Sequence, residues 1–291
     1  SIVEINTDHA HDVRFVFDRH GLAFDILKLQ EELTPASKRH IMSRHNMSFE
    51  EINVRSLLIV LSLVGGLYWY FSPNTATDPS TDISFSYITE VVGNEGEANA
   101  SPLLIALHGN GDTASHFFDT MLHDYPGSAR VVVISGPVAM GTGDAWPTND
   151  EGLRHYGSAL AGAIHKITQK YDHPKEPVLT GFSGGGYMAY YLAAKHGYQF
   201  SAIVPVSGGL PQAIEADTTD SELKVVSLHG TKDRVVSYGQ GKAATDHLKK
   251  AGYSIEHYAF DGDHLGAFRD EVHSNYHQVL HNLSNSRTVK F

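Results

Sequence analysis

The pentapeptide Gly181-Phe-Ser-Gly-Gly185 decides how this chain is interpreted. It follows the short apolar run Pro177-Val-Leu-Thr180 and precedes a helix-like stretch, Gly186-Tyr-Met-Ala-Tyr-Tyr-Leu-Ala-Ala-Lys195. A strand, a sharp turn and a helix in this order hold a nucleophilic serine above a sheet. Glycines flank such a serine because the neighbouring backbones pass too close for side chains. In a chain with 27 glycines, the alternative is a glycine-rich loop without chemistry.

Strands and helices alternate on both sides of this motif from residue 82 onward. The alternation predicts an α/β fold, in which helices cover both faces of a mostly parallel sheet. The connection from Val206 to Leu223 is short, so we expect no large cap domain and an open site. The predicted strands are Ile83–Val92, Pro102–Leu107, Val131–Ser135, Val178–Thr180, Ala202–Val206, Leu223–Leu228 and Ser254–Phe260, and the predicted helices span 151–171, 184–197, 238–252 and 266–283.

Two residues downstream of Ser183 complete a catalytic pattern. A serine hydroxyl needs a base, which is itself oriented by an acid, and in this kind of fold the order is serine, acid, histidine. Asp233 follows the strand in Leu223–Leu228, and His264 follows the strand Ser254–Phe260. We therefore predict Ser183 as nucleophile, Asp233 as orienting acid and His264 as general base.

Other residues could fill these roles. Asp261 and Asp263 are close to His264 in sequence, but neighbours in a turn tend to point apart, so Asp233 is favoured as the acid. His229 could be taken for a base, although its place in a turn before Gly230 favours packing under the loop. His257 lies within a predicted strand and is expected to be structural.

A second glycine-containing loop predicts the oxyanion hole. Two backbone amides should bind the developing oxyanion, one from the residue after the serine and one from a loop after an earlier strand. Gly184 supplies the first. The run His108-Gly-Asn-Gly-Asp112 follows the strand ending at Leu107, and the Asn110 amide is the predicted second donor. A tight turn without catalytic purpose is the alternative.

Four motifs together resemble the phospholipase/carboxylesterase family of α/β-hydrolases. They are His108-Gly-Asn-Gly-Asp112, Gly181-Phe-Ser-Gly-Gly185, His229-Gly-Thr-Lys-Asp-Arg-Val-Val236 and Gly262-Asp-His264. The resemblance covers Leu103 to Leu283 and implies an α/β-hydrolase fold with Ser183, Asp233 and His264 in the roles given above. The family includes carboxylesterases, lysophospholipases and acyl-protein thioesterases.

Two positions depart from the family pattern. Members usually carry Gln directly after the nucleophilic serine, where this chain has Gly184, and an apolar residue is common where it has Asn110. Gly184 still offers its backbone amide, but this position has no side chain. Esterases acting on polyhydroxyalkanoate or feruloyl esters, which share the fold, therefore stay open as alternatives.

Two further features invite interpretation as sites. Trp146, in Gly143-Asp-Ala-Trp-Pro147, could form a wall of the substrate pocket or could simply pack. His273, His277 and His281 are spaced four apart on the last predicted helix, a spacing compatible with metal ligation. No carboxylate or cysteine at a matching spacing completes a site, so we expect a solvated helix face, no metal and no cofactor.

Composition narrows the class of partner. The chain of 291 residues has a net charge of −11, which disfavours nucleic acid as a partner. With 41% hydrophobic and 19% charged residues it reads as an ordinary globular protein, and it has no cysteine for disulfides or thiolate metal sites. The expected partner is a small uncharged or apolar ester substrate. Oligomeric state is not predicted.

An uncharged stretch near the N-terminus predicts a membrane anchor. Ser56 to Thr77 is a stretch of 22 residues without charge, just long enough to span a bilayer, and we place the anchor at its apolar part, residues 56–72. Lys38, Arg39, Arg44 and Arg55 precede this stretch, whereas no Lys or Arg follows until Arg130, so the C-terminal part should be exported, to the periplasm or outside the cell. The alternatives are a buried core helix in a cytoplasmic protein and a cleaved signal peptide of a secreted one.

The chain thus divides into four predicted parts. Residues 1–55 form an N-terminal segment that begins with Ser and that we interpret as upstream or added sequence, with Met42 or Met47 as a natural start. The anchor at 56–72 and a polar linker at 73–81 lead into a catalytic domain at 82–291. The expected function is a serine carboxylesterase for short-chain esters, acting through an acyl-enzyme. Lysophospholipase, acyl thioesterase, serine peptidase and a non-catalytic binding module are the alternatives.

Overall fold

The structure is a computed structural model that describes residues 2–5, 13–16, 74–77, 83–173, 175–217 and 223–285. Its backbone contacts divide the chain into two units, Ser1–Ser72 and Pro73–Phe291. In the first unit, β1 (Ile2–Ile5) and β2 (Val13–Val16) form an antiparallel pair. The predicted anchor at 56–72 lies outside the described residues. Within the part that is described, no helix has the length and apolar character needed to cross a bilayer.

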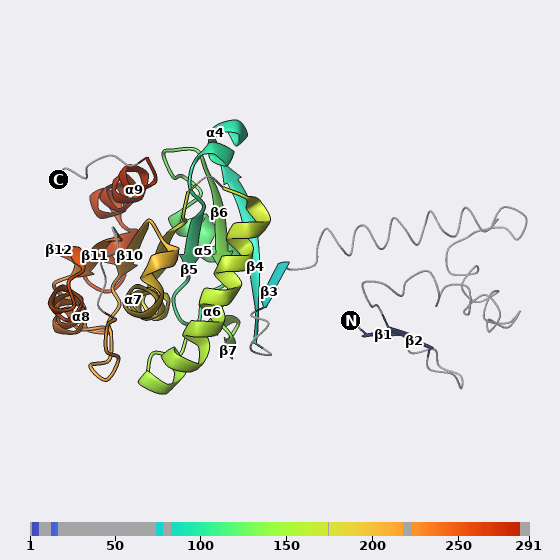
Figure 1. Cartoon of the computed structure of the whole chain (residues 1–291), viewed down its shortest axis with the longest axis horizontal. Coiled ribbons are helices and arrows are strands. Elements are labelled where there is room, and N and C mark those ends of the chain that lie inside the picture. Colours follow the sequence, from blue (N-terminus) through green and yellow to red (C-terminus); the bar gives the residue numbers. More distant parts are fainter. Residues whose placement is uncertain are drawn as a thin grey trace, which may run out of the picture. The chain divides into compact units, whose positions relative to one another are not determined.

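An eight-stranded sheet forms the centre of the second unit (Figure 1). Its order is β12-β11-β10-β9-β5-β6-β4-β3, and the first six strands are parallel. At the other edge, β4 and β3 run antiparallel to their neighbours. The predicted mostly parallel sheet is confirmed. The strands are β3 (Asn74–Thr77), β4 (Ser84–Val92), β5 (Leu104–Leu107), β6 (Ala129–Ile134), β9 (Val178–Phe182), β10 (Ala202–Val206), β11 (Lys224–Gly230) and β12 (Ser254–Phe260).

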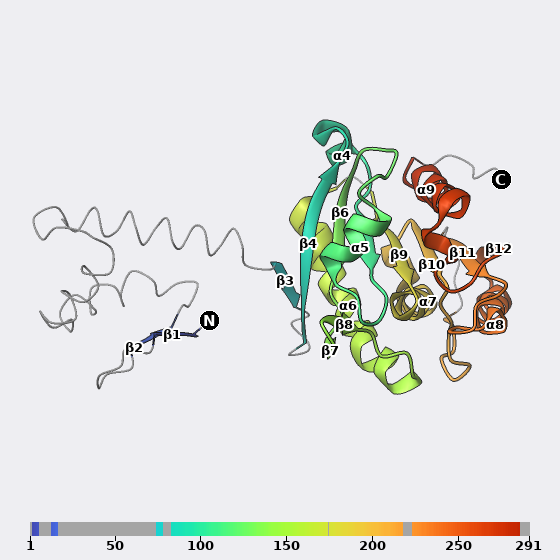
Figure 2. The same ribbon diagram turned by 180° about the vertical axis from the view of Figure 1, so that it is seen from behind.

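Helices cover both faces of this sheet (Figures 1 and 2). Along the central strand β5, Ile105 and Leu107 pack into one core, whereas Leu104 and Ala106 pack into the other. This explains why the central strands are continuous apolar runs, because both faces of a parallel sheet are buried. One face carries α6 (Asp150–Tyr171), α7 (Gly184–His196) and α8 (Tyr238–Lys250), and the other carries α5 (Ala114–Met121) and α9 (Asp270–Ser284).

Side-chain caps set where several helices begin. The Asn149 side chain accepts a hydrogen bond from the Gly152 amide at the start of α6. Thr113 does the same for the His116 amide at the start of α5. Such caps satisfy amides that have no acceptor within the first turn. The helix α5 thereby begins immediately after the 108–112 loop.

Several elements differ from the sequence prediction. The polar run Asn74–Thr77, within the expected linker, forms the edge strand β3, which has no apolar alternation to reveal it. The predicted helix 266–283 is divided into a 3-10 turn, Gly266–Phe268, and α9. The other short elements absent from the prediction are β1, β2, α4 (Glu95–Ala100), α5, the hairpin of β7 (Val138–Met140) with β8 (Gly143–Ala145), and a 3-10 turn at Gly197–Gln199.

A buried polar network joins α7, α8 and the last two strands. The Tyr190 hydroxyl donates to Ser227 Oγ at 2.7 Å and lies 3.3 Å from Thr245 Oγ1. His257 Nδ1 lies 3.0 Å from the same Ser227 oxygen and 3.3 Å from that of Thr245. Burial, reinforced by the nearby His229, Lys242 and Lys249, lowers the pKa of His257 to about 4. The network therefore holds His257 in its neutral form, as expected for a structural histidine.

We predict that this network makes stability fall in mild acid. Between pH 6.5 and about 4 the unfolded chain protonates His257 whereas the folded chain does not, so the free energy of unfolding decreases as the pH falls through that window. Urea denaturation measured from pH 7.5 to 4.5 gives the free energy of unfolding at each pH. For His257→Gln this free energy should decrease less steeply with falling pH than for wild type. His165→Gln, at an exposed position on α6, serves as the control. Equal pH dependence in all three proteins would contradict the assignment.

Candidate active site

Ser183 lies in a strained turn between β9 and α7. Its backbone has φ 53° and ψ −113°, a conformation that costs energy in a residue with a side chain. The turn is closed by the approach of Gly181 to Gly185, since a Cβ on Gly181 would lie 2.2 Å from the Gly185 carbonyl oxygen. The serine is thereby presented at the carboxyl end of β9, half-buried, with the helix starting at the next residue.

The structure brings the three predicted catalytic residues into one hydrogen-bonded chain. Ser183 Oγ lies 2.9 Å from His264 Nε2, and His264 Nδ1 lies 2.7 Å from Asp233 Oδ2. Because ionised Asp233 can only accept, the histidine carries its hydrogen on Nδ1 and turns the lone pair of Nε2 toward the serine hydroxyl. This is the tautomer that a general base beside a serine needs.

The Asp233 carboxylate is buried and fixed from two sides. Its Oδ1 accepts from the backbone amides of Val235, at 2.9 Å, and Val236, at 3.0 Å, while Oδ2 faces His264. His229 is completely buried beneath this loop, with Nε2 2.8 Å from the Val236 carbonyl oxygen and 3.4 Å from Asp233 Oδ2. Burial lowers the pKa of His229, so it supports the loop as a neutral side chain.

The alternative acids point elsewhere. Asp261 pairs with Lys232 at 2.6 Å, and Asp263 pairs with Arg269 at 3.3 Å, both on the surface. Neither carboxylate contacts His264 among the contacts described. The structure therefore does not bring Asp261 or Asp263 into the site.

The 108–112 loop lies beside the serine because β5 and β9 are neighbours in the sheet. His108 is fully buried, with Nδ1 2.7 Å from the Gly109 carbonyl oxygen, and its Nε2 accepts from the Gly136 amide at 2.9 Å. Burial lowers the pKa of His108, which keeps Nε2 available as an acceptor. The amide of Gly111 donates to Asp144 in β8 at 2.8 Å. His108 belongs to the motif 108–112, but its anchoring role was not predicted from the sequence.

The two departures from the family pattern turn out to touch each other. The Asn110 side chain pairs with the backbone of Trp146, where Oδ1 accepts from the amide at 2.8 Å and Nδ2 donates to the carbonyl at 3.1 Å. A Cβ on Gly184 would lie 2.0 Å from Asn110 Oδ1 and 2.6 Å from its Cγ. The space next to residue 184 is therefore occupied by the Asn110 amide. Their contact could not be predicted from the sequence, in which the two residues are 74 positions apart.

Trp146 is part of the core and does not form a pocket wall. Its side chain is completely buried, with the ring centroid 6.1 Å from that of Phe85 and 5.9 Å from that of His108. The interpretation as a substrate-contacting residue is wrong, because an indole without exposed surface cannot line an open site. Its backbone nevertheless supports the site through Asn110.

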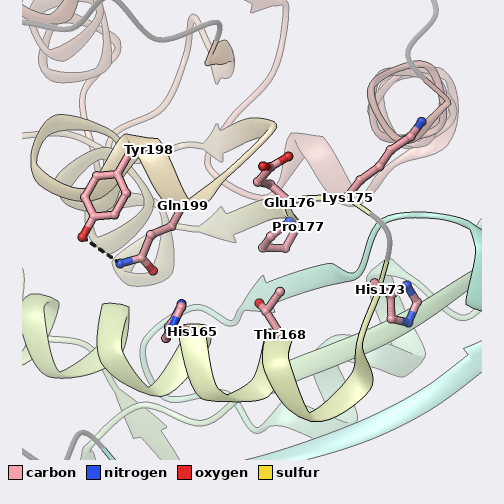
Figure 3. A pocket seen from close by; sticks show the side chains of 8 residues that line it. All are labelled: His165, Thr168, His173, Lys175, Glu176, Pro177, Tyr198 and Gln199. Carbon is pink, nitrogen blue, oxygen red and sulfur yellow. Dashed lines mark hydrogen bonds between the residues drawn. The ribbon is translucent and has the colours of Figure 1, made fainter.

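A hollow of about 370 Å³ lies away from this site (Figure 3). Pro177 and Glu176 line it just before β9 begins, so it opens at the end of the sheet opposite to Ser183. It shares no residue with the hydrogen-bonded chain around the serine. Its other lining residues are His165, Thr168, His173, Lys175, Tyr198 and Gln199.

Part of the chain matches a known family. Residues 157–285 match the family model described as Phospholipase/Carboxylesterase. Ser183, Asp233 and His264 all lie within this part, whereas Asn110 and Trp146 precede it. No curated protein sequence matches the chain.

Solved structures share the fold at low sequence identity. The carboxylesterase of Bacillus cereus is 14% identical, with a TM-score of 0.59 over 68% of this chain and 94% of that one. The carboxylesterase of Mesorhizobium loti is 15% identical, with a TM-score of 0.56 over 72% and 99%. Esterase PE8 is 21% identical, with a TM-score of 0.56 over 68% and 99%. These likenesses concern the fold.

A parallel sheet that carries a serine in a strained strand-to-helix turn defines an α/β-hydrolase. Over residues 157–285, the match to the family model confirms the resemblance to the phospholipase/carboxylesterase family that the motifs indicated. The solved carboxylesterases share the fold of this chain.

We predict that positions 110 and 184 are energetically coupled. In wild type, Gly184→Ala must displace the Asn110 amide and break its pair with Trp146, which should destabilise the fold by about 1 kcal/mol. In an Asn110→Ala background the three atoms nearest to the added Cβ are gone, so the same change should be neutral or stabilising, since Ala favours a helix over Gly. Denaturation of the four proteins gives the coupling energy.

The control for this cycle is Gly239→Ala near the start of α8, where an added Cβ meets nothing closer than Ser237 Oγ at 4.0 Å. Gly239→Ala should change the free energy of unfolding by the same amount whether residue 110 is Asn or Ala. The fluorescence of Trp146, recorded in a Trp69→Phe background so that one indole remains, should respond to Gly184→Ala only when Asn110 is present. Additive free energies would refute the coupling.

Proposed function

We propose that this protein is a serine carboxylesterase that hydrolyses short-chain carboxylic esters through an acyl-enzyme. The observation that carries the proposal is the chain of hydrogen bonds from Ser183 Oγ through His264 to Asp233, with distances of 2.9 and 2.7 Å. Its order and tautomer are those required to deprotonate the hydroxyl at the moment of attack.

In the first half of the proposed reaction, Ser183 Oγ attacks the ester carbonyl carbon while His264 Nε2 takes its proton. The amides of Gly184 and Asn110 would bind the oxyanion. Gly184 is the first residue of α7, so its amide has no acceptor within the helix. The neighbouring amides of Gly111 and Asp112 already donate to backbone carbonyls, which favours Asn110 as the second donor. His264 then protonates the leaving alcohol.

In the second half, water attacks the acyl-serine with His264 again acting as base, and the acid leaves as Ser183 regains its proton. The buried Asp233 carboxylate would stabilise the imidazolium in both halves, since three donors hold it in one orientation. No metal or cofactor takes part in this sequence of steps.

The preference for short acyl chains is proposed from the length of the β10–β11 connection, because residues 207–223 are too few to form a large cap domain. One observation favours a second candidate, a lysophospholipase or acyl thioesterase. Leu265 and Val235, next to His264 and close to Asp233, expose 51% and 72% of their surface and could contact a longer acyl chain. Polyhydroxyalkanoate or feruloyl esterase and serine peptidase remain alternatives with no contact that favours them.

The wild-type protein is to be assayed with p-nitrophenyl esters whose acyl chains have two to sixteen carbons. We expect the highest rate of hydrolysis with the shortest acyl chains. Ser183→Ala should lower kcat on the order of 10⁴-fold or more, since it removes the attacking oxygen. Asp233→Asn should also lower kcat by a large factor, because the amide favours the wrong histidine tautomer. A maximum at long chains would instead support the lysophospholipase candidate.

Two matched variants control these measurements. Ser158→Ala on the exposed side of α6 and Asp263→Asn on the surface should retain wild-type kcat. If Ser183→Ala retained activity, or if Asp263→Asn lost as much as Asp233→Asn, the assignment of the catalytic residues would be wrong. Turnover of peptides but of no ester would point to the peptidase.

We also propose that residues 56–72 tether the protein to a membrane with the catalytic domain exported. The support is the uncharged stretch itself and the Lys and Arg residues that precede it. Carbonate extraction of membranes should leave the full chain in the pellet, while a chain lacking residues 56–72 should be released. Release of both would contradict a spanning anchor.

A further inference from the structure

A cluster of possible metal ligands lies between α9 and the segment that follows α5. His273 and His277 are one turn apart on α9, with their ring centroids 4.2 Å from each other. Both Nε2 atoms are directed at the carbonyl oxygen of Met121, the last residue of α5, at 3.3 and 2.7 Å. The Asp124 carboxylate lies 3.8 Å from His277 Nε2.

This arrangement corrects the expectation of a solvated helix face. His277 is buried, with 5% of its surface exposed, and only His273 and His281 keep partial exposure. The carboxylate that the sequence did not provide on the helix comes from Asp124, about 150 residues earlier, so no spacing pattern could reveal it. His281 packs against Tyr125, with ring centroids 6.1 Å apart, and takes no part in the cluster.

The donor set suits a zinc-class ion. One ligand atom from each of Asp124, His273 and His277 lies within 4.8 Å of the others. A tetrahedral zinc site places its nitrogen and oxygen ligands at about 2.0–2.2 Å from the ion, and therefore about 3.3 Å from one another. The Asp124 side chain is half exposed, so its rotation can close the remaining distance. Two of the three ligands are imidazole nitrogens, which disfavours calcium and magnesium because these ions prefer oxygen ligands.

We propose that Asp124, His273 and His277 form a binding site for a zinc-class divalent cation. His273 and His277 would bind through Nε2 with their hydrogens on Nδ1, and Asp124 through a carboxylate oxygen. The Met121 carbonyl or a water would complete the coordination. Burial lowers the pKa of His277, which agrees with a neutral ligand at pH 7. The site is separate from Ser183 and does not depend on the proposed esterase activity.

The ion would connect two parts of the fold that each follow a loop of the candidate active site. The helix α5 begins directly after the 108–112 loop, and α9 follows His264 after the turn Gly266–Phe268. The competing explanation is that the two histidines merely donate to the Met121 carbonyl at the end of α5. Glutamine can donate in the same way but is a poor zinc ligand, so His→Gln changes separate the two explanations.

The test uses the full chain after treatment with a chelator. Titration with zinc chloride, followed by calorimetry and by the rise in melting temperature, should show one saturable site in wild type. Asp124→Asn and His273→Gln, both at accessible positions, should each weaken binding at least about tenfold, as expected for the loss of a ligand. With cobalt(II) in place of zinc, the wild-type protein should show the visible absorption bands of a tetrahedral site. Both variants should lose these bands.

The matched control is His281→Gln on the same helix, which should bind zinc as wild type does. It also accounts for weak binding by the other histidines, of which the chain has 19. Melting temperatures without metal should be close to wild type in all variants. Wild-type zinc affinity in Asp124→Asn and His273→Gln, or no saturable binding in wild type, would overturn the proposal.

Discussion

The approach of the Gly181 and Gly185 backbones is the contact on which the site depends. With no side chain at residue 181, the carbonyl of Gly185 lies where a Cβ would be, and β9 can pass into α7 within a single residue. Ser183 is that single connecting residue, and its backbone φ is 53°. The strain is sustained by the surroundings, because β9 pairs with β5 and β10 on either side and α7 is buried along most of its length. A wider turn would carry the hydroxyl away from His264.

Two halves of the site have different origins in the chain. The serine turn and the 108–112 loop belong to the adjacent strands β9 and β5, whereas Asp233 and His264 come from the ends of β11 and β12. The hydrogen bond between Ser183 Oγ and His264 Nε2 joins the two halves and connects residues that are 81 positions apart in the sequence. Since both halves stand at carboxyl ends of parallel strands, the sheet itself brings them to one edge. Backbone amides of Val235 and Val236 then hold the acid in place.

The parts that the sequence predicted are those governed by local pattern. Buried strands such as Leu104–Leu107 read as apolar runs, the glycines around Ser183 read as a close turn, and Asp233 and His264 follow from strand order. What escaped prediction depends on contacts between distant segments. The edge strand Asn74–Thr77 is polar, the indole of Trp146 is buried by residues from other elements, and Asp124 meets His277 only in three dimensions. No periodicity or spacing encodes such contacts.

The contact between Asn110 and Gly184 also restricts which substitutions this chain can accept directly after the serine. Any side chain added after the serine collides with the Asn110 amide, and loss of that amide first leaves the Trp146 backbone without its partner. We therefore expect positions 110 and 184 to change together when a side chain is introduced after the serine. For protein engineering, a library that varies residues 110 and 184 together is expected to contain more stably folded variants than one that randomises residue 184 alone.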